Sequence, residues 1–154
     1  AFDIRDEDAV KAAVASVVTL GTPYHGTTWA GLREMYPDLA ALGLSNSQIA
    51  AQVFGVPGNQ QAAGSPLLHR LNSSGETPSG VPFTAIASAA DSIITPPQTA
   101  LLDPAAGDSR NVWLQDGCAT NSAGHGTLLV DPRAIAAVLA ALDDDTDRAL
   151  PCVG

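Results

Sequence analysis

The chain has 154 residues, enough for one domain with a sizeable core, and hydrophobic residues make up 45% of it. Its formal net charge of −9 repels phosphate backbones and anionic lipid head groups, so we expect no nucleic-acid partner. The sequence has no apolar run of the roughly 18 residues that a membrane-spanning helix needs, and we expect no transmembrane segment.

The strand patterns of the sequence indicate an α/β fold. Residues 5–13 mix charge with alanine as the end of a helix does, and residues 14–20 form a β-branched, apolar stretch that ends at Gly21. Residues 81–87 and 111–115 predict two more strands. Because buried strands separated by helical segments are typical of a parallel sheet covered on both faces, we predict such a sheet with flanking helices. Three strands are few for it, so we expect them to be part of a larger sheet.

A long segment, about residues 28–79, separates the first two predicted strands and carries no strand pattern. It contains amphipathic pieces at 29–44, 47–54 and 66–71, which glycine, asparagine and proline divide. Because a compact sheet needs no crossover of this length, we predict a helical, cap-like excursion over the sheet edge.

The C-terminal part predicts a closing helix and an acidic tail. Asp131 and Pro132 have the residue types of an N-cap and a first helical position. The apolar residues that follow recur on one helical face: Ile135, Val138, Leu139 and Leu142. The run 143–147 is typical of a solvated acidic segment.

The two cysteines, Cys118 and Cys152, lie in sequence rich in glycine, serine and proline. We expect a disulfide between them, with two buried free thiols as the alternative. A bridge that closes a loop of this size contributes about 3–4 kcal/mol when it is unstrained. Because disulfides persist in oxidising compartments, the bridge predicts a secreted, extracellular protein.

Two residues suited to acid–base chemistry follow the second and third predicted strands. Asp91 lies in the loop after 81–87, and His125 lies in the loop after 111–115. Functional groups of open parallel sheets gather beyond the carboxyl ends of the strands. An aspartate followed by a histidine is the order that ends a hydrolase triad, in which the imidazole takes a serine proton and the carboxylate fixes its tautomer. The alternative is a surface aspartate and a loop histidine in a glycine-flanked turn.

The loops after the predicted strands resemble those of bacterial lipases and esterases of the α/β-hydrolase superfamily, in particular the secreted actinobacterial type. Residues 17–27 (VVTLGTPYHGT) are similar to the strand and loop that follow the nucleophile helix. Residues 87–97 (ASAADSIITPP) resemble the acid loop, and 124–132 (GHGTLLVDP) resemble the catalytic-histidine loop. The resemblance implies that residues 1–154 are the C-terminal half of one α/β-hydrolase domain, with Asp91 as triad acid and His125 as triad base.

The sequence departs from that family at two points. Tyr24 stands where many relatives have histidine, and His25 follows it. We assign Tyr24, His25 and Ile94 to substrate binding, with a loop-stabilising hydrogen bond as the other interpretation of His25. No Gly-x-Ser-x-Gly occurs, and the nearest stretch, residues 43–47 (GLSNS), lacks the closing glycine. The resemblance therefore implies that the nucleophilic serine and the oxyanion hole belong to an N-terminal half outside this chain.

The resemblance implies carboxylic ester hydrolysis by a Ser-His-Asp triad, with that N-terminal half as partner and an ester or lipid as substrate. It implies no cofactor, and the histidines at 25, 69 and 125 lack the spacing of a metal site. The apolar residues of the excursion favour packing, with a lid that binds acyl chains as the alternative. Other interpretations are an amidase, thioesterase or polyester depolymerase on the same fold, and a non-catalytic, hydrolase-like binding module.

Overall fold

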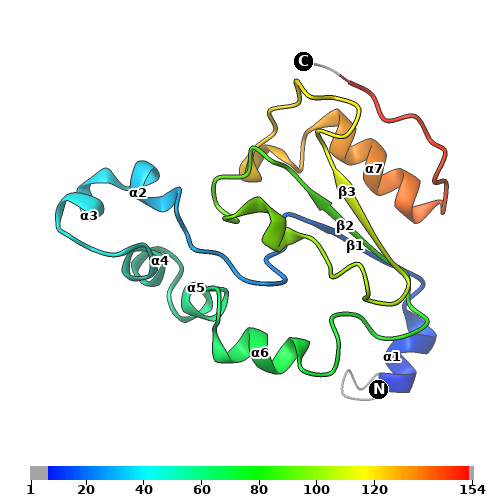
Figure 1. Ribbon diagram of the computed structural model, residues 1–154, viewed down its shortest axis with the longest axis horizontal. Helices are drawn as coiled ribbons and strands as arrows, with labels where there is room; N and C mark the ends of the chain where they lie inside the picture. The colour runs from blue at the N-terminus through cyan, green and yellow to red at the C-terminus, as the bar shows by residue number, and fades with distance from the viewer. Residues whose placement is uncertain (1–6, 153–154) are drawn as a thin grey trace.

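The computed structural model describes residues 7–152, and its centre is a three-stranded parallel sheet. The strands are β1 (Val17–Leu20), β2 (Phe83–Ala87) and β3 (Ser109–Trp113). In the pairing register, Phe83 lies opposite Val17 on one side and opposite Ser109 on the other. Because the strands are parallel, the three loops that follow them leave the sheet at the same end (Figure 1). The prediction of an α/β fold with a parallel sheet is confirmed.

Helices surround the sheet unevenly. In the described residues the helices are α1 (Glu7–Ala13), α2 (Leu32–Met35), α3 (Pro37–Ala41), α4 (Asn46–Phe54), α5 (Val56–Gln60), α6 (Pro66–Asn72) and α7 (Pro132–Leu142), with 3-10 turns η1 (Pro97–Ala100) and η2 (His125–Thr127). Helices α2–α5 form an arm that extends from the sheet, whereas α7 packs on β1 and β2 (Figure 1). No helix among residues 7–152 is long and apolar enough to cross a membrane.

The strand boundaries differ from those that the apolar pattern predicts. The strand predicted at 14–20 begins at Val17, and the one predicted at 111–115 occupies Ser109–Trp113. Ser109 and Arg110 are polar, yet their backbones pair with β2, because ladder hydrogen bonds do not depend on the side chain. Of the helix predicted at 5–13, the first two residues lie outside the described part of the chain.

The arm is helical, as the sequence predicts, but its helices are shorter. The amphipathic piece 29–44 is divided into α2 and α3 at Pro37, whose ring has no N–H to continue a helix. Ser45 starts α4 with a capping box, in which its Oγ accepts from Gln48 N at 3.3 Å and its N donates to Gln48 Oε1 at 2.8 Å. The arm has its own buried residues: Trp29, Leu32, Ile49 and Ala50.

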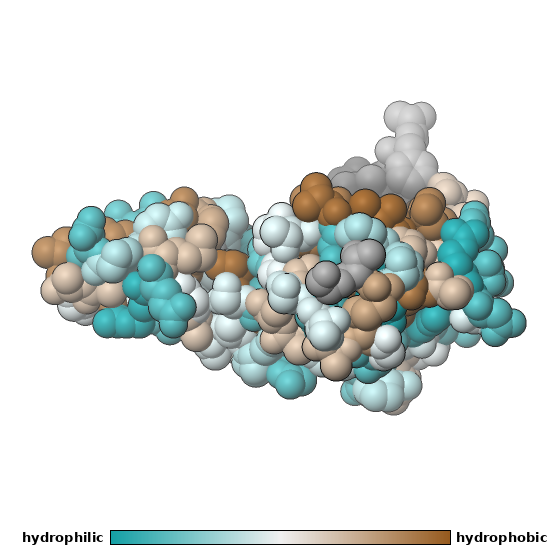
Figure 2. Space-filling view, turned by 90° about the horizontal axis from the view of Figure 1, so that it is seen from above, coloured by the Kyte–Doolittle hydropathy of each residue, from teal (hydrophilic) through white to brown (hydrophobic). Residues whose placement is uncertain are grey.

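The apolar face predicted for α7 lies mostly away from the sheet. Ile135, Leu139 and Leu142 are 45%, 48% and 58% exposed, and Val138 alone of the predicted face packs against the core. Three alanines on the opposite side of α7 are buried, because small side chains let the helix approach the sheet closely. In Figure 2, apolar atoms form a row along one border of the broader body of the molecule.

Strand β1 is an edge strand. The strand order β1-β2-β3 gives it a partner on one side within the described residues. All four of its residues are half-buried, and they are mostly apolar. In the described residues its other edge therefore presents unpaired backbone groups, and α7 packs on the same strand.

Candidate active site

Asp91 and His125 lie together beyond the carboxyl ends of β2 and β3. Nδ1 of His125 is 2.8 Å from Oδ2 of Asp91. The aspartate side chain is 2% exposed and the histidine side chain is 37% exposed. Because a carboxylate only accepts hydrogen bonds, Nδ1 is the donor, and in the neutral ring Nε2 then has the lone pair. This pair has the arrangement of a general base with a buried carboxylate behind it.

The backbone of the acid loop fixes the orientation of Asp91. Its Oδ1 accepts hydrogen bonds from the N–H groups of Ile93 at 2.8 Å and Ile94 at 2.9 Å. All three groups that bond to the carboxylate are N–H donors, so both of its oxygens act as acceptors. The residue thus makes a local turn with one oxygen and holds His125 with the other.

His125 begins the short turn η2. Gly124 before it is extended, and its carbonyl accepts from the N–H groups of Thr127 at 3.0 Å and Leu128 at 3.1 Å. Leu128 is 1% exposed and belongs to the sheet core. The turn is therefore anchored by packing, while the imidazole that starts it remains partly in contact with solvent.

Gln115 joins the acid loop to the histidine loop. Its Nε2 donates to Ser88 Oγ at 3.0 Å and to the carbonyl of Asn121 at 2.9 Å. Its Oε1 accepts from the N–H of Ala89 at 2.9 Å. The two loops that carry the pair are thus held at a set distance by one amide side chain.

Gly21 directly follows β1 and lies against the pair. It has a φ of +53°, and a Cβ at this position would be 3.1 Å from both Asp91 Oδ2 and His125 Nδ1. The close approach of the backbone to the hydrogen bond requires a residue without a side chain. From the sequence, Gly21 is identified as the end of a strand, and its contact with the pair depends on the tertiary fold.

A cleft of about 660 Å³ opens beside His125, between the strand ends and the arm. Most of its lining is apolar and includes Leu20, Trp29, Met35, Phe54, Ile93 and Ile94. The rings of Trp29 and Phe54 stack with their centroids 5.1 Å apart. The outline of the molecule narrows between the arm and the broader body (Figure 2). The imidazole thus lies beside a surface that suits an apolar ligand.

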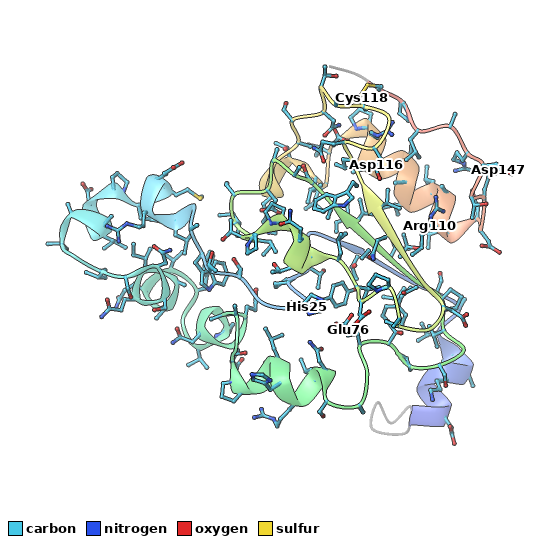
Figure 3. All side chains as sticks on the ribbon, in the orientation of Figure 1. His25, Glu76, Arg110, Asp116, Cys118 and Asp147 are labelled. Carbon is cyan, nitrogen blue, oxygen red and sulfur yellow. A yellow bond between two sulfur atoms is a disulfide. The ribbon has the colours of Figure 1, made fainter. Side chains whose placement is uncertain are left out.

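The residues assigned to substrate binding are not all in this cleft. Ile94 lines it and is 2% exposed. The hydroxyl of Tyr24 instead lies 2.8 Å from Thr19 Oγ1, and His25 Nε2 lies 3.3 Å from Glu76 Oε1. Figure 3 shows His25 and Glu76 next to each other. Tyr24 and His25 are therefore outside the lining of the cleft beside His125, and the contact of His25 with Glu76 links two loops.

Burial raises the pKa of Tyr24 above its usual value of 10.0. The hydrogen bond with Thr19 lowers this pKa, and the charge of Glu76 raises it. The phenol is thus a neutral, half-buried hydrogen-bonding group over the physiological pH range.

A disulfide joins Cys118 and Cys152, with Cα atoms 5.4 Å apart. Next to it, the buried Arg133 of α7 donates from Nη1 to the carbonyls of Leu150 at 2.8 Å and Pro151 at 3.1 Å. Its Nη2 donates to the carbonyl of Asp116. Figure 3 shows Asp116 and Cys118 at the end of the molecule away from His25 and Glu76. The bridge and the guanidinium together fasten the C-terminal tail to the loop that leads to His125.

Within residues 7–152, the ring of His125 forms a hydrogen bond with Asp91 and none with a hydroxyl or thiol group. Thr22 and Tyr36 line the cleft, but neither hydroxyl is bonded to His125. In the same residues, no group of three or more histidine, cysteine, aspartate or glutamate side chains is arranged to hold a metal ion. The described residues thus contain a hydrogen-bonded Asp91–His125 pair whose ring has no hydroxyl or thiol partner.

No protein-family model matches this chain, and no curated protein matches its sequence.

Proposed function

We propose that this chain supplies the acid and the base of a secreted serine ester hydrolase of the α/β-hydrolase type. The observation that carries the proposal is the 2.8 Å contact between Asp91 and His125 beside a cleft with a mostly apolar lining. A buried carboxylate behind a partly exposed imidazole is the part of a catalytic triad that moves the proton.

The proposed fold is the C-terminal part of an α/β-hydrolase sheet. Three parallel strands in sequence order support it, because they bring the loop after β1, the acid loop and the histidine loop to one end. The arm after β1 corresponds in this proposal to a cap-like insertion. The disulfide supports an oxidising, extracellular location for the protein.

The nucleophile in this proposal is a serine on the N-terminal half of the same hydrolase, outside residues 1–154. Two features support such a partner. The free edge of β1 would accept a further strand, and the exposed stripe Ile135, Leu139 and Leu142 on α7 would be covered by a helix of that half. The serine would then meet Nε2 of His125 beside the strand ends, and backbone N–H groups of the same half would form the oxyanion hole.

The proposed reaction proceeds in two acyl-transfer steps. Nε2 of His125 takes the proton of the serine hydroxyl while the serine oxygen forms a bond to the ester carbonyl carbon. Nε2 then gives that proton to the alcohol oxygen as the bond between the carbonyl carbon and the alcohol breaks. In the second step Nε2 takes a proton from water, whose oxygen bonds to the acyl carbon, and returns it to the serine as the carboxylic acid leaves. Asp91 holds the ring in the tautomer with Nδ1 protonated and stabilises the imidazolium.

The cleft supports an ester with an apolar acyl group as the substrate. Trp29, Met35 and Phe54 of the arm line it together with Ile93 and Ile94 of the acid loop. A lining of this kind binds hydrocarbon by removing it from water, at about 25 cal/mol for each Å² buried.

The test uses native material that contains this chain, treated with a fluorophosphonate and assayed with p-nitrophenyl butyrate. We expect the label on a serine outside residues 1–154. His125→Ala should lower the hydrolysis rate by at least about 10³-fold, because a triad member is lost. The matched control is His69→Ala, since His69 is an exposed residue of α6 away from Asp91.

Two outcomes would contradict the proposal. If the folded material neither hydrolyses the ester nor takes the label, the chain is a binding module with hydrolase-like loops. If the material takes the label but cleaves only amide or thioester substrates, the acyl-transfer chemistry stands and the ester assignment is wrong.

A further inference from the structure

We propose that Thr27 is a positioning residue for Asp91: its buried hydroxyl holds the acid loop in the shape that presents the carboxylate to His125. The inference rests on the proposed function, because it assigns a role within the same site. Thr27 lies between β1 and α2, at the root of the arm, where it forms an isolated β-bridge with Ala62.

The hydroxyl of Thr27 has three backbone partners. Thr27 is 1% exposed, and its Oγ1 donates to the carbonyl of Ile93 at 2.6 Å. The same oxygen accepts from the N–H groups of Trp29 and Thr95, each at 3.0 Å. One side-chain atom thus satisfies three buried or half-buried backbone groups from two segments that are far apart in the sequence.

Ile93 is the link between this hydroxyl and the carboxylate. Its N–H donates to Asp91 Oδ1 at 2.8 Å, and its carbonyl accepts from Thr27 at 2.6 Å. The carboxylate and the hydroxyl therefore hold the two ends of the same residue. A rotation of the Ile93 backbone would move its N–H away from Oδ1 and remove one of the two backbone bonds that orient Asp91 toward His125.

The neighbours of Thr27 also bond to the acid loop: Thr95 Oγ1 accepts from the N–H of Ala30 at 3.0 Å and lies 2.8 Å from Thr28 Oγ1. The N–H of Thr28 donates to the carbonyl of Thr95 at 2.8 Å, and the N–H of Gly31 donates to the carbonyl of Ser92 at 3.1 Å. A Cβ at Gly31 would collide with the carbonyl of Ser92. Residues 27–31, which we call the clamp, thus run along the acid loop at close range. Thr27 and Trp29 are the buried residues of the clamp, and the side chain of Thr27 bonds to the loop.

The first experiment compares Thr27→Val with Thr27→Ser in the full 154-residue chain. Valine keeps the branched shape and removes the hydroxyl, whereas serine keeps the hydroxyl and removes a methyl group. The readout is the low-field proton NMR resonance of the His125 Nδ1–H, which depends on the hydrogen bond to Asp91. We expect Thr27→Val to lose or shift this resonance and Thr27→Ser to retain it.

The control for this experiment is Thr99→Val. Thr99 lies in the same loop as Asp91, but its hydroxyl donates to Pro96 and does not touch the clamp. We expect the resonance to be unchanged in this variant. A folded Thr27→Val chain with an unchanged resonance would overturn the proposal.

Gly31→Ala tests the same role without removing the buried hydroxyl. Its added methyl group pushes on Ser92, next to Asp91, while the φ of −70° at Gly31 is open to alanine. Where Thr27→Val does not fold, this variant decides the matter: loss of the resonance supports the clamp, and its retention overturns it.

The activity of the assembled hydrolase gives a separate readout. Misplacement of the acid should lower kcat by on the order of 10- to 100-fold in Thr27→Val, with KM changed much less, and serine should restore it. The NMR experiment needs no substrate. If the proposed function fails, the chain shows no hydrolysis but the resonance still reports on the clamp. If the positioning role fails, hydrolysis is present and the resonance does not respond to Thr27→Val.

Discussion

Asp91 accepts hydrogen bonds from three N–H groups, those of His125, Ile93 and Ile94. A carboxylate can satisfy all three, because both of its oxygens only accept. An amide cannot, since one of its two ends donates. Replacing one carboxylate oxygen of Asp91 by an NH₂ group should therefore change the hydrogen bond to His125.

Asp91→Asn should therefore leave the loop folded and disable the base. If the amide oxygen accepts from Ile93 and Ile94, the NH₂ group meets Nδ1 of His125, which must then give up its proton to Nε2. Ester hydrolysis by the assembled enzyme should fall by about 10⁴-fold in kcat. Nitrogen NMR of the imidazole should report the change of tautomer. The control is Asp116→Asn, at an exposed carboxylate, and an equal loss there would contradict the assignment.

Tyr24 gives the alkaline stability of the fold a defined pH dependence. Its pKa in the folded chain is raised, mainly by burial, above the 10.0 of an exposed phenol. Between these two values the unfolded chain loses the proton while the folded chain keeps it, so the free energy of unfolding decreases as pH rises. Below the unfolded value both states keep the proton, and this contribution to stability is fully present.

Urea unfolding of the wild type and Tyr24→Phe, measured at several pH values on both sides of about 10, checks this prediction. The wild type should lose stability more steeply with rising pH than the variant does. Equal slopes would show that the phenol is not held in its neutral form by the fold. Tyr36→Phe gives the matched comparison at the other tyrosine.

At the scale of elements, the N-cap of α7 connects the closing helix to the histidine loop. Asp131 Oδ1 accepts from the N–H of Ala134 at 2.8 Å, and its Oδ2 accepts from Asn121 Nδ2 at 3.1 Å. Asn121 is buried in the loop before His125. One carboxylate therefore starts the helix and supports the loop.

Asp131→Ala should lower the free energy of unfolding by about 1–2 kcal/mol, because α7 loses its cap and Asn121 loses a partner. Urea unfolding measures the change. Asp143→Ala, which removes an exposed partner of Arg148 at the other end of α7, should change stability by less than about 0.5 kcal/mol. A similar loss in both variants would indicate a general effect of charge and contradict the role of the cap.

The elements that the sequence predicts correctly are those with a strong local signal. β-branched runs locate β1 and β2, and the Asp131–Pro132 pair marks the start of α7. The polar start of β3 is missed because its pairing comes from the neighbouring strand. The apolar pattern predicts the helix α7 but does not show which of its faces is buried, because close packing on the sheet selects alanine and not the large side chains of the pattern.

The candidate site follows the same division. Asp91 and His125 are predicted from their order after two strands, and the structure brings them into contact. Gly21 and Thr27 are missed as parts of the site because their roles depend on approaches between segments that lie far apart in the sequence. A glycine or a threonine in a loop has many other uses, so no local pattern distinguishes these two.

At the scale of the whole molecule, the disulfide and Arg133 hold the C-terminal tail against the body. A bridge between residues 118 and 152 closes a loop that includes η2 and α7. The unfolded chain is therefore restricted in a region that contains the general base and its supports.

Replacing both cysteines, as Cys118→Ser with Cys152→Ser, should lower the free energy of unfolding by about 2–4 kcal/mol, because the unfolded chain gains conformational freedom. Urea unfolding of the variant should match that of the wild type under reducing conditions. A variant as stable as the oxidised wild type would show that the bridge adds nothing beyond the contacts of the tail.

The unequal length of the two crossovers has a consequence for the order of folding. The chain from β1 to β2 runs over residues 21–82, and that from β2 to β3 runs over residues 88–108. Closing the loop that is about three times longer costs roughly 1 kcal/mol more entropy. We therefore expect β2 and β3 to pair before the transition state of folding and β1 to join the sheet after it. In stopped-flow experiments, Val112→Ala on β3 should slow refolding, whereas Val18→Ala on β1 should mainly speed unfolding.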